Sequence, residues 1–167
     1  MKAFNRPSAG NPADRLTVSQ PGFPQRILVV EEESNLRQFN AEVLTCSGYH
    51  VDAAEDGAVA WDALQLNNYG LVVTDNDMPK LTGVELIQKI QAAHMTLPVI
   101  MATGAFPEDE LARRGLLHPA VTLLKPFTFD ELLTAVKEVL RATGDALEEL
   151  APPPNWQFQP LADRFWL

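Results

Sequence analysis

Short apolar runs alternate with amphipathic runs five times between residues 26 and 143, and this alternation constrains the fold more than any other feature of the chain. The apolar runs have the length of strands, and the segments between them carry apolar residues at helical spacing. Strict alternation of strands and helices predicts an open parallel sheet with helices on both faces, in the α/β class. In such a fold, ligands bind where the carboxyl ends of the strands meet.

The expected elements follow from strand length, β-branched residues and capping signals. Strands are predicted over residues 27–30, 50–54, 71–73, 98–101 and 121–124, and helices over residues 34–47, 57–67, 83–94, a short stretch from 107, and 128–143. We expect Ser34 to cap the first helix, Pro107 to take the first position of the fourth, and Thr128 to Glu131 to form a capping box. Gly144 is predicted to stop the last helix.

The segments outside the alternating region have a different composition. Residues 1–25 contain four prolines without periodicity and are predicted to be a flexible leader, so the domain is expected over residues 26–144. Residues 145–167 form a tail with a proline run and four aromatic residues, Trp156, Phe158, Phe165 and Trp166. Exposed aromatic side chains favour docking of the tail onto the domain or onto a partner, and a disordered tail is an alternative of equal weight.

Charge and apolar content exclude several classes of function. The formal net charge of −9 argues against nucleic acid and anionic membrane surfaces as partners, since both require clustered cationic side chains. No apolar run approaches the roughly 20 residues of a membrane helix, and no secretory signal is visible, so a cytoplasmic location is expected. The single cysteine, Cys46, excludes an intramolecular disulfide, and its apolar surroundings predict a buried position.

Polar residues follow four of the predicted strands, all four of which are expected to be buried. Glu31 and Glu32 follow the first strand, Asp75 follows the third, Thr103 the fourth and Lys125 the fifth. Three carboxylates at one sheet edge repel one another and call for a cation, and a hard divalent metal suits oxygen ligands. A metal, a lysine and a hydroxyl around one carboxylate form a site for a phosphoryl group, with Asp75 as the nucleophile.

These residues stand in motifs that resemble the receiver domain of bacterial two-component response regulators. The resemblance covers about residues 26–143 and is carried by ILVVEEESNLR, LVVTDNDMPKLTG, PVIMATG and LLKPFT. Its most specific part is the DxxMPxxxG arrangement that begins at Asp75. The resemblance implies a CheY-like, flavodoxin-like sheet of strand order 2-1-3-4-5 with five helices.

The resemblance also implies a role for each site residue. Asp75 resembles the phosphoacceptor, Lys125 the lysine that bridges phosphoryl group and carboxylate, and Thr103 the switch hydroxyl. Glu32 stands where the family holds Mg²⁺ directly, Glu31 where it acts through water, and the backbone carbonyl of Asp77 is a further metal ligand. A cis peptide bond is expected before Pro126.

The sequence departs from the family at three places. The acidic pair is Glu31–Glu32, where the family has at least one aspartate, and each glutamate is one methylene longer. Thr122 stands where the family often has the aromatic residue of its switch, so output is expected to differ. Gly104 follows Thr103 where alanine is usual, which predicts altered dephosphorylation.

The function implied is phosphorelay signalling. A stand-alone receiver, monomeric or weakly dimeric, would accept a phosphoryl group from a histidine kinase or phosphotransfer protein and signal to an unidentified protein target, without being an enzyme. One alternative is a degenerate receiver that binds partners without phosphorylation. Another is a haloacid-dehalogenase-type phosphatase, suggested by Asp75-Asn76-Asp77, but that family places its DxD motif on the first strand.

Overall fold

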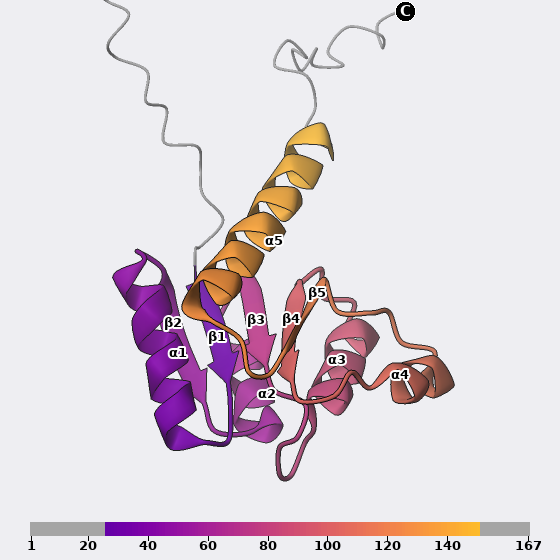
Figure 1. Ribbon diagram of the computed structural model, residues 1–167. Helices are drawn as coiled ribbons and strands as arrows, with labels where there is room; N and C mark the ends of the chain where they lie inside the picture. Colours follow the sequence, from indigo (N-terminus) through magenta and orange to yellow (C-terminus); the bar gives the residue numbers. More distant parts are fainter. Residues whose placement is uncertain (1–25, 151–167) are drawn as a thin grey trace, which may run out of the picture.

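The computed structural model describes residues 26–150, with side chains through residue 144, and shows five strands alternating with five helices (Figure 1). The strands are β1 (Arg26–Val30), β2 (His50–Ala54), β3 (Leu71–Thr74), β4 (Val99–Thr103) and β5 (Val121–Leu124). The helices are α1 (Ser34–Cys46), α2 (Gly57–Leu66), α3 (Gly83–Ala92), α4 (Glu108–Arg114) and α5 (Phe129–Leu150). The predicted leader and the aromatic part of the tail lie outside the described residues.

All four strand pairings are parallel, and the strand order is β2-β1-β3-β4-β5. The predicted fold class, the five helices and the strand order are therefore confirmed. Reversal of the winding direction between β1 and β3 creates the crevice at the carboxyl ends of the strands where ligands bind in this class of fold. The parallel arrangement brings the residues that follow β1, β3, β4 and β5 to one edge of the sheet.

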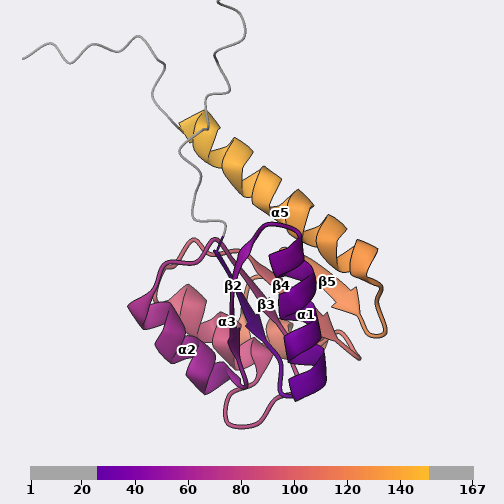
Figure 2. The same cartoon turned by 90° about the vertical axis from the view of Figure 1, so that its left-hand side faces the viewer.

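The strands divide their side chains between two apolar layers, because successive residues of a strand point to opposite faces. Leu28 and Val72 pack with α2, α3 and the buried Leu111 of α4 on one face. Ile27 and Leu71 pack with α1 and the first half of α5 on the other. Figure 2 shows the two layers edge-on, with α2 and α3 on one side of the sheet and α1 and α5 on the other.

The edge strand β5 is less buried than we predicted. Every residue of β4 is buried, whereas β5 is only half-buried and Leu124 is 59% exposed. Helix α4 lies beside α3, away from β5, at the far right of Figure 1. Arg114 holds it there, since its Nη1 donates to Oε1 of Gln88 on α3 at 2.8 Å. The outer side of β5 is left open as a result.

Three local predictions at helix ends need correction. The N-cap of α1 is Glu33, whose side chain makes no capping hydrogen bond, and Ser34 is the first helical residue. Pro107 is the N-cap of α4 and not its first residue. Cys46, in the last turn of α1, is exposed, because the buried stripe of that helix runs through Asn40 and Leu44. The capping box between Thr128 and Glu131 is confirmed.

The prediction that Gly144 stops the last helix is wrong, because α5 continues to Leu150. Gly144 has an ordinary backbone conformation, without the left-handed φ of a helix-ending glycine. The residues that follow it, DALEEL, include good helix formers that offset the entropic cost of one glycine, and the next strong helix breaker is the proline run after Ala151. Within the described residues, no helix is both long and apolar enough to cross a membrane.

Replacing Gly144 with alanine should therefore strengthen the end of α5. A Cβ at this position meets nothing within 4 Å. Alanine favours a helix interior over glycine by about 0.5–1 kcal/mol, so amide hydrogen exchange over residues 141–150 should slow about two- to fivefold. Unchanged or faster exchange would mean that the helix ends at Gly144 in solution.

Candidate functional site

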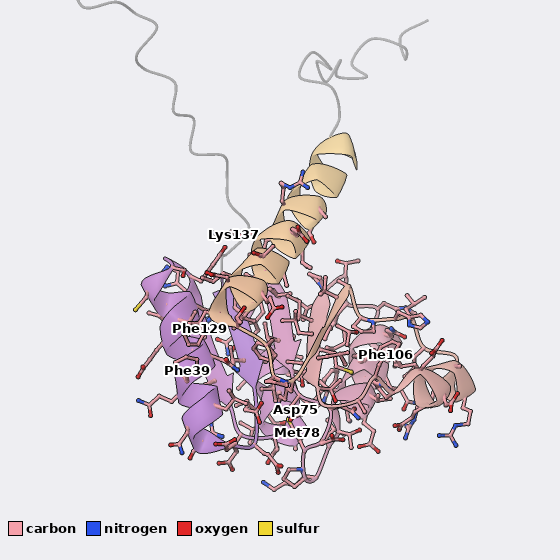
Figure 3. All side chains as sticks on the ribbon, viewed as in Figure 1. Phe39, Asp75, Met78, Phe106, Phe129 and Lys137 are labelled. Atoms are coloured by element: carbon pink, nitrogen blue, oxygen red, sulfur yellow. The ribbon has the colours of Figure 1, made fainter. Side chains whose placement is uncertain are left out.

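The candidate site lies where β1, β3 and β5 end and is centred on one lysine between two carboxylates. Nζ of Lys125 lies 2.7 Å from Oδ2 of Asp75 and 2.7 Å from Oε2 of Glu31. The carboxylates of Glu31 and Asp75 are 4% and 9% exposed, so one cation pairs with two acidic groups that are nearly withdrawn from water. Figure 3 shows Asp75 at the strand ends, beside Met78.

Backbone amides hold the second oxygen of Asp75. Its Oδ1 accepts hydrogen bonds from the amides of Asn76 at 2.6 Å and Asp77 at 3.3 Å. The backbone turns sharply after β3, which points both amides back at the carboxylate. Asp75 thus has a fixed orientation, with one oxygen toward backbone donors and the other toward Lys125.

The environment of Lys125 keeps its ammonium charged. Partial burial by itself lowers the pKa of Lys125, but the hydrogen bonds to Asp75 and Glu31 outweigh it, and the net shift is upward. The Lys125–Pro126 peptide bond is cis, as expected.

Thr103 and Thr122 lie on neighbouring strands. The hydroxyl of Thr103 is fully buried at the end of β4 and donates to the carbonyl oxygen of Ala105 at 3.2 Å. Thr122 is half-buried on β5, where it pairs in register with Met101. Thr103 thus reaches the end of the sheet that carries Asp75, while Thr122 lies one strand further out, on the open edge.

The predicted metal ligands are only partly brought together. Glu31 turns inward, whereas Glu32 is exposed and Asp77 lies at the surface. Among the side chains of residues 26–144, no three His, Cys, Asp or Glu are grouped closely enough to hold a metal ion. The nearby donors are carboxylate and backbone oxygens, a set that fits a hard cation such as Mg²⁺.

Arg37 supports the acidic pair, although its sequence position in α1 gave no sign of such a role. Its Nη1 donates to the carbonyl oxygens of Glu31 at 2.7 Å and Glu32 at 3.0 Å. The amide of Glu33 also donates to Oε1 of Glu31 at 3.3 Å. The inward orientation of Glu31 is therefore built into the first turn after β1.

The loop from Asp75 to Gly83 is anchored to helix α3 at its far end. Oδ1 of Asn76 accepts from the amide of Val84 at 3.1 Å, and the carbonyl of Asn76 accepts from the amide of Gly83 at 3.1 Å. Met78 is buried in the core beside α3. A capping box between Thr82 and Glu85 begins the helix.

A second ion pair ties this loop to α2. Asp56, nearly fully buried, caps α2 through the amides of Ala58 and Val59, and its Oδ2 lies 2.6 Å from Nζ of Lys80. Lys80 has a left-handed backbone with φ of 63°, a conformation that costs energy in a residue with a Cβ. The hydrogen bond from Lys80 and the backbone hydrogen bonds hold the pKa of Asp56 below its ordinary value of 3.8.

Substitutions of Asp56 should separate its role as the cap of α2 from its role in the ion pair with Lys80. Asp56→Ala removes the helix cap and should lower the free energy of unfolding by about 1–2 kcal/mol, whereas Asp56→Asn keeps the cap and should cost less.

The ion pair should also make stability depend on pH. Because the pKa of Asp56 is depressed in the folded state, its charge stabilises the fold at pH values above its ordinary pKa of 3.8, and this contribution is lost as pH falls through the lower folded-state pKa. The difference in unfolding free energy between wild type and Asp56→Asn should therefore be constant near neutral pH and vanish below that value. Urea titrations across pH measure it, and a difference that persists in strong acid would exclude the ion pair as its cause.

Several known proteins are similar to this chain in sequence. The sequence profile of the response regulator receiver domain matches residues 27–137. Response regulator RppA of Synechocystis is 36% identical over 138 residues, which cover 81% of this chain and 58% of that protein. Response regulator receiver protein CpdR of Brucella abortus is 32% identical over 122 residues, which cover 71% of this chain and 98% of that protein.

A solved structure is similar in fold and sequence. Response regulator protein TrrA of Thermotoga maritima, in complex with Mg²⁺-BeF, is 34% identical with a TM-score of 0.60, over 68% of this chain and 97% of that chain. The chain spans about half the length of several curated relatives; the match to response regulator MprA from Mycobacterium, for example, covers 53% of that protein. The match to CpdR covers nearly all of that protein.

Proposed function

Because this chain belongs to the response regulator receiver family and so to two-component phosphorelay signalling, we propose that it accepts a phosphoryl group on Asp75 from a histidine kinase or a phosphotransfer protein. The observation that carries this proposal is the convergence of Asp75, Glu31 and Lys125 at the strand ends, with Asp75 and Lys125 in contact at 2.7 Å. A receiver is a signalling protein and not a catalytic enzyme.

The proposed step transfers one phosphoryl group between two carriers. A carboxylate oxygen of Asp75 attacks the phosphorus of the donor's phosphohistidine and forms a P–O bond as the P–N bond breaks. The electron pair of the P–N bond returns to the donor imidazole, and the product on this chain is an acyl phosphate. Asp75 suits this step because two backbone amides fix its orientation at the carboxyl end of β3.

Lys125 and Thr103 would stabilise the group being transferred. The ammonium of Lys125, already 2.7 Å from Oδ2 of Asp75, can turn toward the new phosphoryl oxygens, where it offsets their negative charge. The Thr103 hydroxyl can donate to the same oxygens once it leaves the carbonyl of Ala105. Both groups act on charge that is present only when the phosphoryl group arrives.

Mg²⁺ is the metal we propose for this site. TrrA was solved with Mg²⁺-BeF, and Glu31, Asp75 and the backbone carbonyl of Asp77 offer oxygen donors here. Glu32 is exposed beside Glu31 and would complete the set if its side chain turned inward. When bound, Mg²⁺ supplies positive charge for the oxygens of the transferred group.

Incubation of the full chain with Mg²⁺ and acetyl phosphate, followed by intact mass, tests the proposal. A gain of one phosphoryl group is expected. Borohydride reduces an acyl phosphate to an alcohol, so peptide mapping after reduction should place the modification at residue 75, with Asp77 as the internal control.

This experiment and a separate phosphatase assay distinguish the alternatives. No mass gain under any metal condition would support a degenerate receiver that binds partners without phosphorylation. Modification at another carboxylate would refute the assignment of Asp75. Steady phosphate release from a generic phosphomonoester would point to phosphatase chemistry, which the receiver-family match already disfavours.

A further inference from the structure

The switch of this receiver lacks an aromatic residue on β5, yet an aromatic ring lies close to Thr103 along the chain. Phe106 follows Thr103 by three residues, in the loop between β4 and α4, and is 37% exposed. We propose that Phe106, stacked on His118, is the ring that transmits the position of the Thr103 hydroxyl to helix α4. This inference rests on the proposed function, since it concerns how phosphorylation at Asp75 is read.

The first link is a single hydrogen bond. The Thr103 hydroxyl donates to the carbonyl oxygen of Ala105 at 3.2 Å and holds the loop before Phe106 against the end of β4. A hydroxyl has one proton to donate, so donation to a phosphoryl oxygen requires release of Ala105. Ala105 is exposed, and water can take the place of the lost donor. The change of hydrogen-bond partner by Thr103 therefore costs little free energy and releases the loop between β4 and α4.

The second link is the contact between Phe106 and His118. Their ring centroids lie 5.8 Å apart with an interplanar angle of 28°, so the rings are stacked. His118 belongs to the segment between α4 and β5. Figure 3 shows Phe106 on the side of the domain that carries α4, with Asp75 at the strand ends. The stack therefore connects the loop before α4, through Phe106, to the segment after α4, through His118.

The segment that carries His118 is fixed to α3. Gln91 makes two hydrogen bonds with the backbone of Leu117, since its Nε2 donates to the carbonyl at 3.2 Å and its Oε1 accepts from the amide at 3.2 Å. His118 is the next residue, so its backbone is anchored to α3 through Leu117. A movement of Phe106 would change the distance between the two rings.

Helix α4 is secured at its C-terminal end and weakly held at its N-terminal end. Leu111 is fully buried, and Arg114 pairs with Gln88 of α3. At the other end, the N-cap Pro107 supplies no side-chain hydrogen bond. Loss of the bond between Thr103 and Ala105 therefore lets the N-terminal end of α4 pivot about its anchored end, and Phe106 leaves His118.

The test uses the three histidines of the chain as reporters. With selectively ¹³C-labelled histidine, the Cε1–H resonance of His118 carries a ring-current shift from Phe106, and the Phe106→Leu variant defines its value without the stack. After phosphorylation by acetyl phosphate and Mg²⁺ at constant pH, the His118 resonance should move most of the way to the Phe106→Leu value. His50 and His94 should stay where they are, and the His118→Gln variant assigns the peaks.

Two further variants make the outcome decisive even without phosphorylation. Thr103→Val is nearly isosteric but cannot hold Ala105, so unphosphorylated Thr103→Val should already show the released His118 position. Thr103→Ser keeps the hydroxyl and should match wild type. Intact mass of each sample reports phosphorylation separately, so a failure to phosphorylate counts against the proposed function alone. A His118 resonance unmoved in phosphorylated wild type, or at its wild-type position in Thr103→Val, would overturn the inference.

Discussion

Lys125→Met is expected to reduce phosphoryl incorporation from acetyl phosphate by about 100-fold or more and to destabilise the fold. Loss of one group that offsets charge in a transferring phosphoryl costs about 10²–10³ in rate. The substitution also leaves Glu31 and Asp75, 4% and 9% exposed, without the cation that lies 2.7 Å from each. An unpaired buried charge costs about 3–5 kcal/mol, and the lower end applies because Lys125 is 24% exposed.

Rates from intact mass and urea unfolding at neutral pH measure the two effects. The raised pKa of Lys125 means that its stabilising charge is fully present below the ordinary value of 10.5 and is lost only as pH rises through the folded-state pKa. Wild type and Lys125→Met should therefore differ throughout the neutral range. Lys137→Met, on an exposed position of α5, is the matched control and should change neither quantity. Equal phosphorylation rates in wild type and Lys125→Met would remove Lys125 from the proposed site.

Gly83→Ala should be the most disruptive single-methyl addition near the site. A Cβ at Gly83 would lie 2.3 Å from the carbonyl oxygen of Asp75 and 3.0 Å from Cα of Asn76, and backbone atoms cannot rotate away as a side chain can. Overpacking of this kind costs about 1–3 kcal/mol or more. The start of α3 and the backbone of Asp75 must separate, so phosphorylation should fall together with stability.

Gly104→Ala is the control for the added methyl group, because a Cβ there meets nothing within 4 Å. Urea unfolding should give Gly104→Ala a free energy close to that of wild type and Gly83→Ala a clearly lower one. If the two variants were equally stable, the tight contact between α3 and Asp75 would not exist in solution.

The fold could be predicted because most strands are short apolar runs and most helices show an apolar stripe, whereas β2 and α4 are weaker in both respects. The end of α5 could not, since Gly144 is a common stop signal that here lies inside a helix continued by strong helix formers. The burial of β5 also escaped prediction. Its sequence, VTLL, is nearly as apolar as that of β4 and gives no sign of exposure. Leu124 is exposed because α4 lies beside α3 and does not cover it.

In the site, order along the chain predicted that Asp75 and Lys125 would meet, because parallel strands bring their carboxyl ends together. Chain order did not distinguish Glu31 from Glu32. The family resemblance assigned the direct contact with Mg²⁺ to Glu32, yet Glu32 is exposed and Glu31 is the residue that turns inward. Backbone geometry after β1 and the hydrogen bonds from Arg37 turn Glu31 inward, and nothing in a run of three glutamates reveals which one that will be. The contact between Asp56 and Lys80 was equally hidden, since it joins two loops 24 residues apart.

The contact between Lys125 and Glu31 joins residues separated by 94 positions. A chain whose last strand has not yet joined the sheet, or has been removed by proteolysis, still carries Asp75 but lacks the ammonium beside it. Such a chain would be a poor acceptor. If Asp75 is the acceptor proposed above, phosphorylation would therefore depend on completion of the sheet, because only a copy in which β5 has joined it places Lys125 beside Asp75 and Glu31.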